Sequence, residues 1–251
     1  MGIISLLAAA ITAALTGNLV HAEEQKTDHE VSFNAAVTSD YRYRGISQAR
    51  LQPALQGGAD YVHNASGFYA GTWLSSIKFV NDAGGSGNIE VDIYAGKRGA
   101  ITEKMSYDAG VLTYIYPSNG LNPSANTTEI YGQLAYGPAY LKYSRSVTTL
   151  FGFADSEGSA YLDAGVNLDV GNGFILNLHA GHQTVEGSSS GLSNSRFSYT
   201  DWKVGFSRDL GIATGALAVI GSNAGKTSYA SPVNGKFMGK SGLVLSISKT
   251  F

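Results

Sequence analysis

The strongest constraint on this chain is an alternation of apolar and polar residues that recurs in about twelve segments after residue 22. Successive side chains on a β-strand point to opposite faces, so a period of two predicts strands that each have one apolar face. The predicted strands cover residues 31–43, 55–61, 67–77, 89–95, 107–115, 128–136, 139–143, 160–170, 174–180, 200–206, 212–222 and 243–251. Segments 67–77 and 212–222 alternate poorly, and their faces stay unassigned. We therefore expect an all-β fold.

The connections between these strands alternate in length. The short turns lie near residues 64–67, 96–104, 136–138, 171–173 and 209–211. Most of them contain Gly, Asn or Asp, which accept positive φ angles. The long polar segments are residues 44–53, 78–86, 117–125, 147–158, 184–197 and 223–238. All short turns then fall on one edge and all long loops on the other, which is the layout of an outer-membrane barrel with short periplasmic turns and long extracellular loops.

The low charge content indicates which face of the strands meets lipid. Only 14% of the residues are charged, against about 25% in ordinary soluble domains. A soluble barrel would need many more charged residues to cover its exterior. No charge falls in the middle of an assigned apolar row, where a Lys or Arg would cost about 2–4 kcal/mol in a bilayer. We therefore predict an antiparallel transmembrane β-barrel of about twelve strands, with outer-membrane lipids against its apolar exterior.

Aromatic residues mark the two edges of that apolar exterior. One set lies on apolar rows at the short-turn end of the strands: Tyr61, Tyr107, Tyr136, Phe174, Phe206 and Phe251. Tyr41, Tyr43 and Tyr143 continue such rows toward the long-loop end. Girdles of this kind are expected where aromatic rings lie at the level of the lipid headgroups.

The N-terminal segment predicts export. Residues 3–15 form the longest apolar run, which at about 13 residues is too short to span a bilayer as a helix. Val20-His21-Ala22 is a small-residue site of the kind that signal peptidase cleaves. We assign residues 1–22 to a signal peptide and residues 23–251 to the barrel. The segment lacks the usual Lys or Arg at its start, so a buried N-terminal helix is the alternative.

Three blocks carry a family resemblance. Residues 39–48 read SDYRYRGISQ, residues 53–61 read PALQGGADY and residues 67–73 read GFYAGTW. These blocks resemble the TorF-type porin family of proteobacteria. The block DWKVG at residues 201–205 extends the resemblance toward the C-terminus. The resemblance implies a barrel and a channel, but it names no solute and brings no catalytic residues.

The C-terminal strand carries a second resemblance. It ends in Phe251, on the same face as Leu243, Leu245 and Ile247. A terminal aromatic after alternating hydrophobic residues resembles the signal by which outer-membrane barrels are recognised for assembly. This resemblance implies the barrel-assembly machinery as a partner. An ordinary final strand is the alternative.

If the apolar rows face lipid, the residues between them face the lumen. The charged members of this set are Asp40, Arg42, Arg44, Asp60, Glu90, Asp92, Asp108, Glu129, Lys142, Asp163, Asp169, Asp201 and Lys203. Nine are acidic and four are basic, and carboxylate rings favour cations. We predict that these residues line a pore with a weak preference for cations. Asp40, Arg42 and Arg44 are candidates for a mixed-charge constriction near the outer mouth.

Inward-facing tyrosines add a candidate solute contact. Tyr94, Tyr114, Tyr131, Tyr140 and Tyr161 point the same way as the charges, and their rings could bind sugar or nucleoside faces. A barrel of about twelve strands lies between the filled eight-stranded barrels and the open barrels of 16–18 strands. Passive diffusion of small hydrophilic solutes is therefore the first interpretation. A plugged structural or adhesive barrel that binds a partner through its loops is the second.

Other functions have less support in the sequence. The chain has no cysteine, which excludes disulfides and thiolate catalysis. Its net charge is −2, so it lacks the excess of basic residues that is typical of nucleic-acid-binding proteins. An outer-membrane hydrolase needs a nucleophile beside a base. His179 and His182 are three residues apart, so on a strand they face opposite sides. We expect no enzymatic activity, no cofactor and no metal.

Overall fold

The computed structural model describes residues 27–251, and the predicted signal peptide over residues 1–22 lies outside the described residues. Within them, twelve antiparallel strands close into a single barrel. The barrel strands are β1 (His29–Thr38), β4 (Ala54–His63), β5 (Phe68–Ser76), β6 (Ile89–Ala100), β7 (Met105–Ile115), β8 (Thr127–Tyr136), β9 (Ala139–Ser146), β10 (Ala160–Asp169), β11 (Phe174–Thr184), β14 (Tyr199–Asp209), β15 (Thr214–Ser222) and β16 (Gly242–Thr250). The predicted fold is confirmed.

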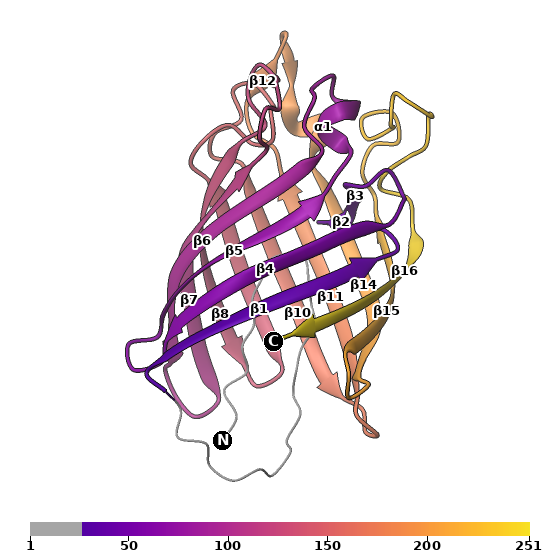
Figure 1. Cartoon of the computed structure of the whole chain (residues 1–251). Helices are drawn as coiled ribbons and strands as arrows, with labels where there is room; N and C mark the ends of the chain where they lie inside the picture. The colour runs from indigo at the N-terminus through magenta and orange to yellow at the C-terminus, as the bar shows by residue number, and fades with distance from the viewer. Residues whose placement is uncertain (1–26) are drawn as a thin grey trace.

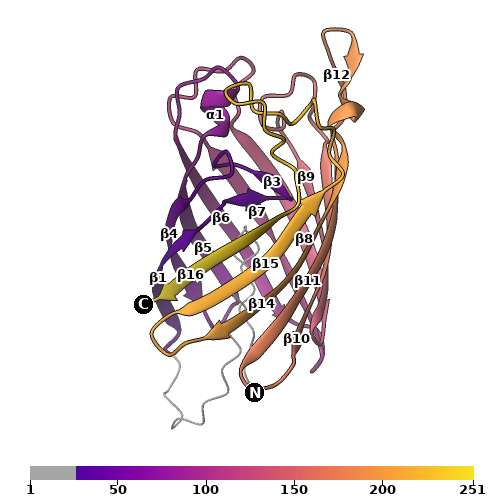
Figure 2. The ribbon, with the colours of Figure 1, turned by 90° about the vertical axis from the view of Figure 1, so that its right-hand side faces the viewer.

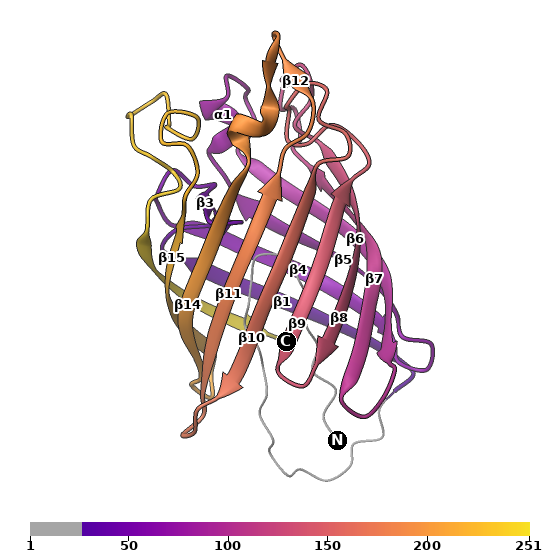
Figure 3. The same cartoon turned by 180° about the vertical axis from the view of Figure 1, so that it is seen from behind.

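Consecutive barrel strands are neighbours, and β1 closes the ring against β16. Phe33 and Phe251 exchange a pair of backbone hydrogen bonds at this seam. Closure is a physical requirement in lipid, because hydrocarbon cannot satisfy the backbone N–H and C=O groups of an edge strand. The five short turns lie at one end of the barrel, here the turn end, and the six long loops lie at the other, here the loop end (Figures 1 and 3).

The exterior is apolar, as the alternation predicts. Leu55, Leu243 and Phe251 are each about two-thirds exposed, at 68%, 66% and 67%. Exposure of that size on apolar side chains is costly in water and favourable in hydrocarbon. Together with the closed barrel it places the protein in an outer membrane. None of the helices in residues 27–251 is long and apolar enough to cross a membrane.

The aromatic residues predicted for the turn end lie on the outer face. Tyr61, Tyr136, Phe174, Phe206 and Phe251 are exposed there, and Tyr107 is half-buried. At the loop end Tyr143 is exposed as predicted. Tyr41 and Tyr43 are not, because the chain leaves the barrel wall after β1 ends at Thr38, and Tyr41 is buried inside the barrel. Placing these two tyrosines in an outer girdle was therefore wrong.

The structure also assigns what the sequence left open. In β5 the alternation sends Phe68 and Leu74 outward and Tyr69 and Trp73 inward. In β15, Leu217 and Val219 face outward while their neighbours face the lumen. β6 extends to Ala100, so the predicted turn at residues 96–104 shrinks to residues 101–104. Arg98 consequently lies on a strand opposite Asp108, a lumen-facing cation that sequence reasoning placed in the turn.

The abundance of Gly and Tyr has a structural explanation on the inner wall. Gly71 lies opposite Tyr94, Gly96 opposite Tyr69 and Gly165 opposite Tyr140 in the strand register. A Cβ atom on any of these glycines would meet atoms of the facing tyrosine at 2.4–2.6 Å. The rings therefore lie against the bare backbone of the neighbouring strand. Tyrosines packed in this way line the wall without projecting across the lumen.

Candidate functional site

The loop between β1 and β4, residues 39–53 and here called L1, folds into the barrel. It carries the short hairpin of β2 (Arg42–Tyr43) and β3 (Ile46–Ser47), which pair only with each other. Figure 2 shows this hairpin between the barrel walls, below the rim of the loops. A Cβ atom on Gly45 would lie 2.5 Å from the Cβ atom of Asp201 on β14. L1 therefore starts at β1 and reaches the opposite wall.

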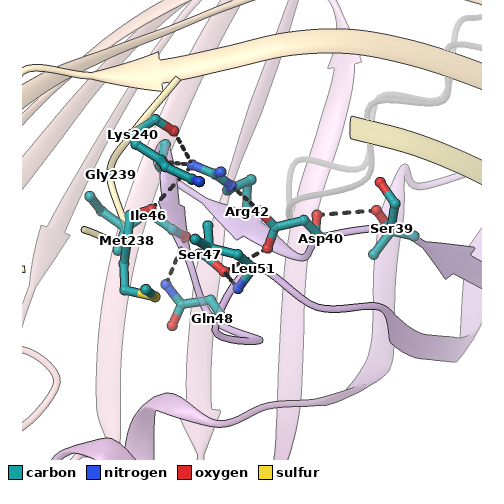
Figure 4. Close-up of polar contacts among 12 residues, drawn as sticks. Ser39, Asp40, Arg42, Ile46, Ser47, Gln48, Leu51, Met238, Gly239 and Lys240 are labelled. Atoms are coloured by element: carbon teal, nitrogen blue, oxygen red, sulfur yellow. Dashed lines mark hydrogen bonds and ion pairs between the residues drawn. The ribbon is translucent and has the colours of Figure 1, made fainter. Parts of the chain in front are cut away.

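Arg42 fixes one side of L1 (Figure 4). Its Nε donates to Asp40 Oδ2 at 2.6 Å, and its Nη1 lies within hydrogen-bond distance of the carbonyls of Gly45, Met238 and Lys240. Burial raises the pKa of Asp40, while the adjacent Arg42 and a hydrogen bond from Ser47 act in the opposite direction. The Asp40–Arg42 pair thus ties L1 to the loop between β15 and β16, residues 223–241 and here called L6.

Arg44 crosses the lumen from the tip of the hairpin. Its Nη2 donates to Glu129 Oε2 on β8 at 2.6 Å, and its Nη1 donates to Gln183 Oε1 on β11 at 2.6 Å. The guanidinium also stacks over the rings of Tyr43 and Tyr161, with its carbon 4.8 and 4.3 Å from the ring centroids. The side chains of Arg44 and Glu129 are only 6% and 2% exposed. This is a buried charge pair that links L1 to two strands of the wall.

The other side of L1 packs on aromatic and acidic side chains. Tyr41 donates to Glu90 Oε1 at 2.5 Å and meets the ring of Trp73 edge-on at a centroid distance of 5.3 Å. Tyr116 donates to the second oxygen of Glu90 at 2.7 Å. Tyr43 is hydrogen-bonded to Tyr114 on β7. L1 therefore fills the loop half of the lumen with contacts to strands on both sides.

The rim of the barrel adds a third attachment. Arg50 forms an ion pair with Asp82, at the end of α1 (Phe79–Asp82) in the loop between β5 and β6. The same carboxylate accepts a hydrogen bond from Ser231 of L6 at 2.9 Å. Arg50 and Leu51 both have positive φ angles, of 60° and 61°. Such angles are uncommon for residues other than glycine and are held here by surrounding contacts.

The lumen-facing carboxylates toward the turn end are held by tyrosines of the wall. Tyr94 donates to Asp60 at 2.6 Å, and Tyr69 donates to Asp108 at 2.5 Å. Tyr69 is also bonded to Tyr131. Asp60 and Asp108 are half-buried rather than buried. Of the tyrosines predicted as solute contacts, Tyr94, Tyr140 and Tyr161 donate their hydroxyl groups to the carboxylates of Asp60, Asp163 and Asp201.

His179 lies between two carboxylates at mid-height. Its Nδ1 is 2.8 Å from Asp163 and its Nε2 is 2.8 Å from Asp201. An ionised carboxyl group can accept hydrogen bonds but cannot donate them. An imidazole ring between two carboxylates therefore suits the doubly protonated imidazolium, which donates from both nitrogens. His182 lies on the outer face beside Thr200, so the two histidines face opposite sides as predicted. Residues 27–251 hold no group of three or more His, Asp or Glu residues arranged to bind a metal.

The predicted lumen charges fall into three groups in the structure. Those brought together around L1 have buried side chains and are Asp40, Arg42, Arg44, Glu90, Asp92, Glu129 and Asp201. Those on the middle and lower wall are Asp60, Asp108, Lys142, Asp163 and Lys203. Asp169 stands apart at the turn end, where it is exposed and accepts from the backbone N–H of Gly171.

Comparison with known proteins gives a family and a fold. The profile of a bacterial protein family of unknown function, Gcw_chp, matches residues 22–251. The chain belongs to the Gcw_chp family. No curated protein matches it significantly in sequence.

Solved structures show the same fold as this member of the Gcw_chp family. A KdgM porin, solved in complex with disordered oligogalacturonate, superposes with a TM-score of 0.53 at 6% identity, over 88% of this chain and 97% of the porin. A NanC porin superposes with a TM-score of 0.53 at 10% identity, over 88% of this chain and 98% of the porin. At such low identity the likeness concerns the barrel and carries no solute across.

Proposed function

We propose that this barrel is a non-enzymatic porin for the passive diffusion of small hydrophilic solutes, with a weak preference for cations. The observation that carries the proposal is a wall that is apolar outside and lined inside by hydrogen-bonded carboxylates and tyrosines. L1 is the proposed constriction. The likeness of the barrel to two porins supports this function.

The lumen charges support the cation preference. Asp60 and Asp108 are partly accessible and lie on different strands of the wall. Carboxylates around a pore favour cations. Arg98, opposite Asp108, offsets part of this charge. We therefore expect the preference to be weak.

Reconstitution into planar bilayers tests the porin function. We expect discrete conductance steps from the purified protein, with a reversal potential displaced toward cations in a salt gradient. Pure, folded barrels that give no discrete conductance would contradict the proposal. They would favour the second candidate, a plugged barrel, for which the buried ion pairs of L1 are the supporting observation.

Three finer inferences accompany this function. The blocks at residues 39–48, 53–61 and 67–73 support placement with TorF-type porins. The apolar face of β16 that ends in Phe251 supports recognition by the barrel-assembly machinery. Residues 1–22 would direct export and be removed by cleavage after Ala22. Phe251→Ala tests the second inference, because it keeps the backbone hydrogen bonds to Phe33, so folding in vitro would be retained while insertion in cells would fall.

A further inference from the structure

The outer face of the barrel carries an apolar groove at the turn end. It runs from the turn that joins β10 to β11 across the ends of β14 and β15, and it holds about 630 Å³ (Figure 3). Binding sites for small molecules span about 300–1,000 Å³. The walls of the groove are the outward-facing side chains of Phe174, Phe206, Leu217 and Leu245.

Gly215 on β15 forms the floor of this groove. It pairs with Arg208 on β14 and with Ile247 on β16, and Arg208 pairs in turn with Phe174 on β11. Gly215 is thus the bare position in an outward-facing row of large side chains. A Cβ atom there would have only Leu210 nearby, at 3.1 Å. In a bilayer, lipid chains fill such a gap, because an empty gap would forfeit dispersion contacts.

Arg208 gives the groove a positive charge. It lines the groove, it is exposed on the outer face, and its guanidinium carbon lies 4.8 Å from the centroid of the Phe174 ring. Among residues 27–251, none forms an ion pair with it. Lys249 is a second exposed cation at the turn end, on β16 and 5.2 Å from the ring centroid of Phe251. The chain therefore supplies cations here without supplying their counterion.

Two carboxylates lie close by in the sequence but belong to the turns. Asp169 and Asp209 take inward positions at the ends of β10 and β14. Asp169 accepts the backbone N–H of Gly171, and Asp209 accepts that of Gly211. Each carboxylate is thus held by its own turn, on the face of the strand opposite to the groove.

The level of the groove in the membrane follows from its aromatic residues. Phe174 and Phe206 belong to the exposed aromatic set of the turn end, and such sets lie at the level of the lipid headgroups. The short turns of outer-membrane barrels face the periplasm. Arg208 therefore lies near the phosphate groups of the periplasmic leaflet, and the apolar gap over Gly215 is open to the acyl chains of that leaflet.

We propose that this groove binds one anionic phospholipid of the periplasmic leaflet, with an acyl chain against Gly215 and the phosphate beside Arg208. The apolar walls and the cation without an ion pair match the two parts of such a lipid. A basic residue near the membrane surface contributes about fivefold to the affinity for anionic lipid. The site depends on the position of the barrel in the membrane and not on conduction through its lumen.

Native mass spectrometry of the delipidated protein in detergent tests this site. The probes are dioleoylphosphatidylglycerol and dioleoylphosphatidylcholine, which have the same chains and phosphate but differ in net charge. Arg208→Gln removes the cation, Arg208→Lys keeps it, and Gly215→Val fills the gap. Lys97→Gln is the matched control, because Lys97 is exposed at the turn end of β6, lies 5.0 Å from the ring centroid of Phe68 and does not line the groove.

We expect the wild-type protein to bind its first phosphatidylglycerol about fivefold more tightly than phosphatidylcholine. Arg208→Gln should lose this preference, while Arg208→Lys and Lys97→Gln should keep it. Gly215→Val should weaken both lipids several-fold, because the chain loses its place on β15. Equal affinity of the wild type for both lipids, or an equal loss in Lys97→Gln, would overturn the site. Undiminished binding by Gly215→Val would overturn the placement of the chain. A barrel that binds the lipid but gives no conductance would overturn the porin function alone.

Discussion

The two halves of the lumen are built differently. In the loop half, L1 crosses the barrel and buries Glu90, Asp92 and Glu129 beneath it. In the turn half, the side chains among residues 27–251 that enter the lumen come from the strands, and Asp60 and Asp108 remain partly accessible. In the proposed pore, the constriction is therefore formed by a loop and not by the strands of the wall. In the wall, Tyr69, Tyr94 and Tyr140 lie against glycines of the neighbouring strands.

Removing L1 from the lumen should produce the largest effect. Replacing residues 41–47 with a short Gly-Ser linker takes away the hairpin and Arg44. We expect single-channel conductance to rise several-fold, on the order of the change between a filled and an open barrel. Shortening the hairpin of β12 (Ser188–Ser189) and β13 (Leu192–Ser193), which projects away from the barrel, is the control (Figure 3). Equal conductance in both variants would show that L1 is not the constriction.

Breaking the central ion pair should cost stability in the loop half. Arg44→Ala leaves Glu129 buried without its cation, and loss of one partner of a buried pair costs about 3–5 kcal/mol. We expect a matching fall in the free energy of unfolding, measured by urea titration in detergent micelles. Arg44→Ala combined with Glu129→Gln should recover part of the loss. A single variant as stable as the wild type would mean that Glu129 is hydrated and that L1 does not seal the loop half.

Displacing a wall tyrosine from the glycine that it packs against should narrow the lumen. In Gly165→Ala the new Cβ would lie 2.4 Å from the ring of Tyr140. Overpacking of this kind costs about 1–3 kcal/mol. We expect reduced stability and a reduced conductance, because the displaced ring enters the lumen. Gly132→Ala is the control, since a Cβ atom at that position would have no other atom within 4 Å beyond its chain neighbours, and it should match the wild type in both measurements.

Neutralising lumen carboxylates should give the smallest effect on conduction. It should also distinguish the turn half, where the carboxylates are accessible, from the loop half, where they are buried. Asp60→Asn with Asp108→Asn removes two accessible charges, while Glu90→Gln with Asp92→Asn removes two buried ones. We expect a shift of a few millivolts in reversal potential toward anions for the accessible pair, and a smaller one for the buried pair, because pore carboxylates favour cations. An equal shift for both pairs would show that the loop half is open to ions as well.

The sequence was most informative where structure is local. Each hairpin joins neighbouring strands, so the period-two rows and the alternating connection lengths were enough to predict the closed barrel and its apolar exterior. The same rule predicted opposite faces for His179 and His182. It gave a wrong result for Tyr41 and Tyr43, because an alternating segment continues to look like a strand after the chain has left the sheet. It missed Arg98 because a glycine in β6 resembled the start of a turn.

The tertiary structure decided what occupies the lumen. Arg44 bonds to Glu129 and Gln183, which are 85 and 139 positions away, and these residues meet only because the barrel closes around L1. The pairing of Gly165 with Tyr140 depends likewise on the register between two strands. Alternation fixes which face a side chain takes, but it carries no information on which strand lies across the lumen. Residue pattern therefore determined the barrel, and closure and register determined its interior.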